Sequence, residues 1–136
     1  MNVTGTNWTV AIPPISGAGL NYAGTYESAT NQILLKVDIP LLLSSGKVSN
    51  PTWNSNLILS TKRTGNGSTV CLVCTMTGGT AYQTVTLTDI ELFRLSALAA
   101  VISYSNIPIQ LQLSGVSVTI PAATYNSRVL FTISAL

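Results

Sequence analysis

The chain has 136 residues and a mass of 14.3 kDa, a length that fits one domain with a single hydrophobic core. Only 7% of the residues are charged, against about a quarter in an average soluble domain, and there is no histidine. The 46% content of hydrophobic residues and the mean hydropathy of +0.44 exclude a disordered chain, and six scattered Lys and Arg residues are too few for a nucleic-acid binder.

The low charge indicates a protein that buries part of its surface against other subunits. Soluble monomers usually depend on a mixed, charged surface. A transmembrane helix needs roughly 18–20 continuous apolar residues, and the best stretch, residues 90–104, is shorter and contains Glu91 and Arg94. We therefore expect a structural, assembling protein without membrane insertion.

The amino terminus lacks the features of a secretory signal peptide. Met1–Thr4 has neither a basic n-region nor an apolar h-region. We favour a protein made in the cytoplasm without export over one whose signal peptide has been removed. The glycosylation sequons at Asn2, Asn7 and Asn66 would matter only in the second case.

The N-terminal region predicts one strand and then a long loop. Residues 7–12 alternate apolar and polar side chains until Pro13. Residues 15–30 are rich in Gly, Ser, Asn and Tyr, and sixteen residues without regular structure are unusual in a compact domain. We interpret residues 1–30 as an N-terminal arm or loop that packs on a neighbouring subunit.

The middle of the chain predicts a β-meander. Gly65–Ser68 contains an Asn-Gly pair, which is typical of a tight hairpin turn, and Gly78–Gly79 predicts a second turn. The segments around these turns should therefore pair in antiparallel fashion with their neighbours in sequence. The expected strands are residues 31–39, 56–63, 69–76 and 81–87.

Cys71 and Cys74 lie in one of these expected strands. Residues three apart on a regular strand point to opposite faces, with Cα atoms about 10 Å apart, and a disulfide needs about 7 Å or less. Two thiols without histidine also cannot complete a zinc site. We expect two core side chains and a chain that does not depend on disulfides.

Residues after position 88 predict the one helix. Thr88 and Glu91 match a capping box, and the segment behind them is rich in helix formers and apolar on most sides. We expect a buried helix over about 89–103. A strand continuing over residues 84–95 is the alternative.

The C-terminal part predicts strands with neutral edges. Apolar residues alternate over 107–113, and the alternation shifts by one residue at Gly115, as at a β-bulge or tight turn. Residues 95–127 contain no charge, although exposed strand edges normally carry Lys, Pro or bulges. Residues 128–134 alternate again, and we expect 125–136 to form an edge strand or one exchanged with a neighbour.

These patterns predict a mainly β protein with a single domain over residues 1–136. The expected fold is an antiparallel β-sandwich, jelly-roll-like, or a barrel, with about 7–8 short strands and one buried helix.

The sequence predicts no enzyme activity, no cofactor and no metal. There is no histidine to serve as a base, and the four carboxylates do not suggest a catalytic pair. Asp89 and Glu91 are explained by a helix N-terminus, and Glu27 and Asp38 are isolated in sequence.

The predicted function is that of a self-assembling structural subunit of a large particle, in particular a viral or phage virion protein: a coat, capsid decoration or tail component. Its partners would be copies of itself and other structural proteins of the virion, without direct contact with nucleic acid. A secreted pilin-like fibre subunit that assembles by strand donation into an extracellular filament is one alternative. A carbohydrate-binding β-sandwich module is another. The residues expected at the assembly interface are Trp8, Tyr22, Tyr26, Gln110, Gln112, Val129, Phe131 and Ile133.

Overall fold

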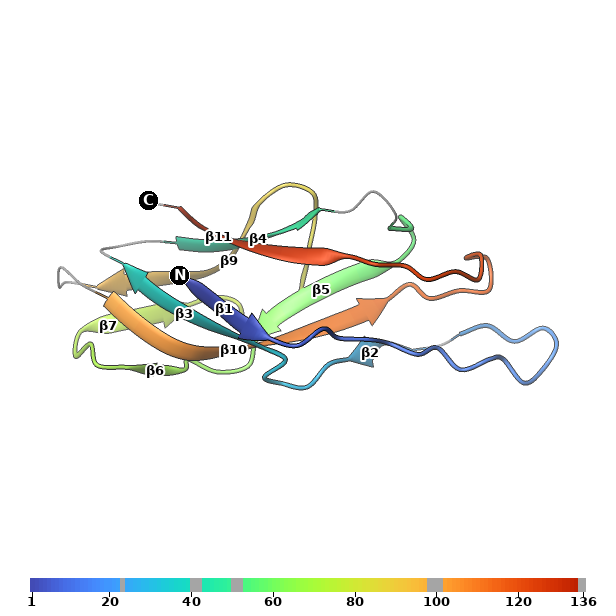
Figure 1. The fold of residues 1–136 in the computed structure, drawn as a ribbon, viewed down its shortest axis with the longest axis horizontal. Helices are drawn as coiled ribbons and strands as arrows, with labels where there is room; N and C mark the ends of the chain where they lie inside the picture. Colours follow the sequence, from blue (N-terminus) through green and yellow to red (C-terminus); the bar gives the residue numbers. More distant parts are fainter. Residues whose placement is uncertain (23, 40–42, 50–52, 98–101, 135–136) are drawn as a thin grey trace.

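The computed structural model describes residues 1–22, 24–39, 43–49, 53–97 and 102–134. They form eleven β-strands in two antiparallel sheets, so the protein is mainly β, as predicted (Figure 1). More strands are present than the expected 7–8, because several have only two residues. No helix occurs in these ranges, and hence none long and apolar enough to cross a membrane.

The larger sheet is built around β10 (Ile102–Ser114), which is 13 residues long. One edge of β10 pairs with β3 and then β2, and the other edge pairs with β5 and then β6. Two further strands extend the sheet, β1 beside β3 and β8 beside β5. The bounds of these strands are β1 Asn2–Gly5, β2 Tyr26–Glu27, β3 Ile33–Ile39, β5 Ile58–Arg63, β6 Ser68–Thr69 and β8 Gln83–Thr84.

The smaller sheet has the strand order β11-β4-β9-β7. β11 and β4 pair at seven consecutive positions, whereas the pairing of β4 with β9 shifts register. Ser44 lies opposite Phe93 and Ser45 opposite Glu91, so Leu92 is an extra residue, as in a β-bulge. The strands are β4 Leu43–Ser49, β7 Cys74–Thr77, β9 Ile90–Ala97 and β11 Arg128–Ser134.

One hydrophobic cluster takes its side chains from both sheets. The bulge in β9 lets two successive residues, Leu92 and Phe93, enter this cluster, and both are almost fully buried. The alternating pattern of β3 and β10 supplies the other side of the core, as period two predicts for strands with one buried face. The buried members are Leu35, Val37, Leu92, Phe93, Leu95, Tyr104, Ile107, Ile109 and Phe131.

The prediction of a buried helix over 89–103 is wrong. β9 and β10 occupy most of that range, and residues 98–101 lie outside the described part of the chain. The expected capping box does not form either: residues 90–97 are a strand, the Glu91 carboxylate pairs with Arg94 at 3.0 Å, and the Thr88 hydroxyl lies 3.2 Å from the Thr86 hydroxyl. Pairing with β4 and β7 outweighs the helix propensity of the segment.

The predicted hairpin around Gly65–Ser68 is wrong as well. β5 and β6 both pair with the same edge of β10, so the chain continues in one direction past this segment instead of reversing. The positive φ of Gly67 (65°) is used where the backbone passes Ser105 and Asn106 closely, and Asn106 itself has a φ of 56°. β7 then joins the smaller sheet beside β9.

The expected strands differ in how well they match. The expected strand over 31–39 matches β3 from Ile33 on, and residues 107–113 lie within β10. In the described residues β11 stands at the end of the smaller sheet. Residues 7–12 are not a strand, since the N-terminal strand is β1. The chain turns at Gly115, with a φ of 78°, and no strand follows over residues 116–120.

The expectation that Cys71 and Cys74 cannot pair is wrong. They form a disulfide with Cα atoms 5.6 Å apart. Residues 72–73 form a turn, and β7 begins only at Cys74, so the regular-strand spacing of about 10 Å does not apply.

Candidate functional site

β11 ends the smaller sheet with a regular strand that has a single charge, Arg128, at its first position. From Val129 to Ser134 it contains no charge and no proline, and its pairing with β4 has no bulge. Leu130 is 41% exposed. Natural sheets usually protect their edges with charged residues, prolines or bulges. Because residues 129–134 have none of these, this part of the strand is suited to contact with another chain.

β1 ends the larger sheet and also lacks charges. All four of its residues are exposed, and it is held on β3 by four residue pairs and by the Thr4 hydroxyl, which donates to the Leu34 carbonyl. The Gln32 amide donates to the Thr6 carbonyl just beyond the strand. β1 therefore adds backbone pairing but no buried side chain to its own subunit.

Three of the residues expected at an assembly interface belong to the core. Phe131 is buried in the main cluster, and Val129 and Ile133 pack against it. Contact with a neighbour through β11 would thus use its backbone edge and Leu130. The sequence reasoning missed Leu130, although its place between these inward residues follows from period two.

The predicted aromatic interface residues are scattered. Trp8 is half-buried and packs with Trp53 against a second small cluster around Leu59 and Val85. Tyr26 is half-buried in β2, opposite Leu113 of β10, and Tyr22 is half-buried as well. The structure does not bring these aromatics together with β11, except that Val129 also packs on the cluster that Trp8 contacts.

The two predicted interface glutamines are covered by the segment at β2. The Gln110 amide is buried and donates to the Ser28 carbonyl at 2.9 Å. The Gln112 amide donates to the Glu27 carboxylate at 3.0 Å. The side-chain amides of both glutamines are therefore hydrogen-bonded to residues 27–28 of their own chain and not to a neighbouring subunit.

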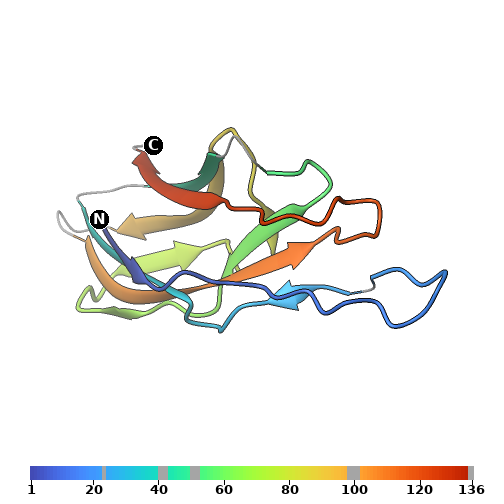
Figure 2. The ribbon, with the colours of Figure 1, turned by 45° about the vertical axis from the view of Figure 1, so that its right-hand side comes forward.

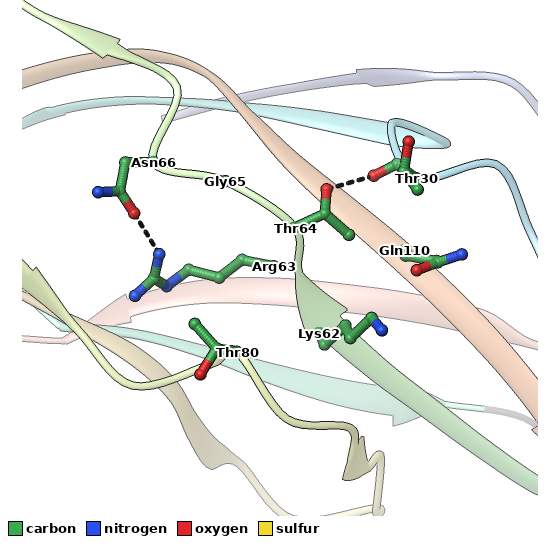
Figure 3. Close-up of a pocket in the computed structure, with 8 residues that line it drawn as sticks. All are labelled: Thr30, Lys62, Arg63, Thr64, Gly65, Asn66, Thr80 and Gln110. Atoms are coloured by element: carbon green, nitrogen blue, oxygen red, sulfur yellow. Dashed lines mark hydrogen bonds between the residues drawn. The ribbon is translucent and has the colours of Figure 1, made fainter.

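A pocket of about 450 Å³, lined mostly by residues with polar side chains, lies at the end of β5 beside Gln110 of β10 (Figure 3). Lys62 and Arg63, which are successive residues of β5, leave the strand in different directions, so their charges do not converge on one point. Thr64 donates to the Thr30 carbonyl at 2.7 Å across one side. The lining consists of Thr30, Lys62, Arg63, Thr64, Gly65, Asn66, Thr80 and Gln110.

Arg63 acts as a structural tether in this pocket. Its guanidinium donates to the Gly78 carbonyl and the Asn66 side-chain oxygen, and its backbone N–H donates to the Gly79 carbonyl. Its side chain has no ion pair with any carboxylate in the described ranges, and burial lowers its pKa. The residue joins the loop after β5 to the turn after β7.

The opposite face of β5 carries Lys62, whose ammonium lies 4.2 Å from the centre of the Tyr82 ring. The Tyr82 hydroxyl is buried and has no hydrogen-bond partner within the described residues. Its burial, together with the nearby Glu27 carboxylate, raises the pKa of Tyr82 to about 12. One oxygen of the Glu27 carboxylate, Oε1, accepts a hydrogen bond from Gln112.

Stability is expected to decline between pH 10 and pH 12 because of Tyr82. In the unfolded chain the phenol ionises near its ordinary pKa of 10.0, whereas the folded state retains the proton up to about pH 12. The folded state thus binds more protons in this range, so its stabilisation is complete below pH 10 and is lost as the pH rises.

Urea midpoints at pH 9 and pH 11 measure this effect. Tyr82→Phe keeps the ring beneath Lys62, is expected to be nearly neutral at pH 7 because the lost hydroxyl had no partner, and should show a smaller decline at pH 11. An equal decline in both proteins would contradict the assignment.

The turn between β6 and β7 is the most exposed apolar feature of the described chain. Val70, Leu72 and Val73 expose 90%, 99% and 57% of their surface beside the Cys71–Cys74 disulfide. The sequence reasoning placed this segment inside a strand and missed it. The signal that could have located it is a run of apolar residues between two cysteines spaced for a turn.

No group of three or more His, Cys, Asp or Glu side chains that could hold a metal ion occurs in the part of the chain that the structure describes. The pocket groups can donate and accept hydrogen bonds, but the two cations stand apart and no carboxylate lines the pocket.

No protein-family model, no curated protein and no solved structure matches this chain.

Proposed function

We propose that this protein is a structural subunit that assembles with copies of itself in a viral or phage virion, as a coat, decoration or tail component. The observation that carries the proposal is β11, a regular strand at the end of the smaller sheet that has no charge after its first residue, Arg128, and exposes Leu130. A free monomer would leave this strand as a template for pairing with other chains.

The finer fold is part of the same proposal. We infer that the two sheets pack face to face as a jelly-roll-like β-sandwich. The support is the single hydrophobic cluster to which β3 and β10 of one sheet and β9 and β11 of the other contribute buried side chains.

The expected mass of the native protein in light scattering is a multiple of 14.3 kDa, and Leu130→Lys is expected to lower it. A charge on an edge strand opposes pairing with another strand, while an exposed substitution changes the free energy of unfolding by only about 0.5 kcal/mol. This point substitution is preferable to deletion of the C-terminal strand, since the deletion would remove the core residue Phe131.

Leu87→Lys is the matched control, because Leu87 is 68% exposed and lies in the loop between β8 and β9. It should leave the assembled mass unchanged. A wild-type monomer at high concentration would contradict the assembly proposal, and equal losses in both variants would contradict the role of β11.

The disulfide favours a second candidate, a subunit of an extracellular filament. Disulfides form and persist mainly in oxidising compartments, and Cys71 and Cys74 are paired. In this case β1, which contributes no buried side chain to its own subunit, would be suited to exchange. Thiol alkylation of the protein from its native source separates the two candidates: an oxidised pair supports export, and two free thiols support the virion.

A further inference from the structure

The charge of Arg63 is buried in the pocket at the end of β5. The residue is only 7% exposed, and its strand runs beside β10 in both views of the fold (Figures 1 and 2). The structure describes all four residues with carboxylate side chains, and no ion pair joins any of them to Arg63. Buried charges are normally paired, because an unpaired one loses its hydration without compensation. Within the described chain, this cation therefore lacks an anionic partner.

The Arg63 guanidinium also has more donors than acceptors around it. A guanidinium has five N–H groups, and two of them are used here, because Nε donates to the Gly78 carbonyl and Nη1 to the Asn66 side-chain oxygen. The remaining three have no acceptor among the residues that the structure describes. The Thr80 hydroxyl lines the same pocket and has no hydrogen bond in this part of the chain either. In Figure 3 the guanidinium lies between Asn66 and Thr80.

The size and charge of the pocket indicate which ligands it can accept. Its volume of about 450 Å³ lies within the roughly 300–1,000 Å³ of small-molecule sites. Lys62 adds a second positive charge to the lining. Guanidinium groups bind carboxylates and phosphates through paired N–H···O bonds. Because Lys62 and Arg63 point in different directions, Arg63 suits a single oxyanion group, and the two cations do not form a clamp for a polyphosphate.

We propose that this pocket binds a small molecule through one oxyanion group, a carboxylate or a phosphate, which pairs with Arg63. The oxyanion accepts hydrogen bonds from the free N–H groups of Arg63 and from the Thr80 hydroxyl. It supplies the negative charge that the surrounding chain does not, so the bound protein is more stable to unfolding than the free one. The site lies within one subunit and does not rest on the assembly proposed above.

Thermal unfolding of the full chain in sodium phosphate or sodium acetate, with sodium chloride keeping the ionic strength constant, tests the inference. The midpoint of the wild type is expected to rise by about 3–8 °C for each tenfold increase of the bound anion above its dissociation constant. Asn66→Asp places a carboxylate against Arg63. This variant is expected to be more stable than the wild type without added anion, and to bind the anion at least about tenfold more weakly, because like charges repel.

Asn54→Asp is the matched control. Asn54 precedes β5, whereas the pocket lies at the other end of that strand, and its side-chain oxygen accepts from the Asn56 N–H at 2.9 Å, a bond that a carboxylate retains. This variant should respond to the anion like the wild type, since general salt effects act on all variants alike. A rise with either anion that Asn66→Asp removes and Asn54→Asp keeps supports the site. No rise of the wild-type midpoint in phosphate or acetate, or equal rises in the wild type and Asn66→Asp, would overturn the inference.

Discussion

Replacement of Phe93 by alanine is expected to lower the free energy of unfolding by about 3–5 kcal/mol. Phe93 is 0% exposed and lies in the cluster that both sheets share. Removal of its ring loses the burial of a large apolar surface and leaves a cavity between strands that cannot fully collapse. Since a domain of this size is stable by only about 5–15 kcal/mol, urea unfolding should show a large shift of the midpoint.

Leu87→Ala provides the reference for this experiment. Leu87 is 68% exposed, so its truncation should change the free energy of unfolding by no more than about 0.5 kcal/mol. A cost below about 1 kcal/mol for Phe93→Ala would contradict the shared core.

Replacement of Gly79 by alanine is expected to cost about 2–5 kcal/mol, from backbone strain and overpacking together. Gly79 has a φ of 73°, and a Cβ there would lie 2.7 Å from the Leu92 carbonyl oxygen and 3.2 Å from Cγ of Arg63. The change would therefore disturb both the bulge in β9 and the tether made by Arg63. Thermal or urea unfolding measures the loss.

Gly19→Ala isolates the contribution of the close approach. Gly19 has nearly the same φ, 77°, but no atom lies within 4 Å of the position that a Cβ would take. Its substitution should therefore cost only the conformational strain, about 1–2 kcal/mol. Equal costs at the two glycines would show that the tight packing around Gly79 does not contribute.

The parts of the fold that could be predicted are those with one buried face and no irregularity. β3, the regular part of β10 and β11 follow period two, and their inward residues are buried or packed against the core. β9 was expected only as the alternative strand over residues 84–95, because its bulge buries Leu92 and Phe93 in succession and Leu95 two positions later. Such spacing resembles the apolar face of a helix.

The sequence located the turn residues correctly but predicted the wrong connection between the strands. The Asn-Gly pair at Asn66 marks a position of positive φ, yet the chain does not reverse there, since β10 offers the same edge to β5 and β6. Whether a strand reverses or continues depends on a partner more than thirty residues away in sequence. Local pattern therefore cannot decide it.

The candidate site was predictable only in its general character. The low charge and an alternating C-terminal strand without charge after Arg128 could be predicted from the sequence. The burial of Gln110 under Ser28 and the tether of Arg63 to Gly78 arise from contacts between segments 15 to 82 residues apart. A glutamine or arginine in a strand gives no local signal of such a partner.

The position of β10 in the chain determines when the larger sheet can form. Four strands of the larger sheet pair with it directly, and the last residue of β5 precedes the last residue of β10 by 51 positions. During synthesis at about 5–20 residues per second, β5 waits roughly 3–10 seconds for its partner. Long-range pairing of this kind also makes folding slow. The first half of the chain must therefore remain free of aggregation on the ribosome until residue 114 has emerged.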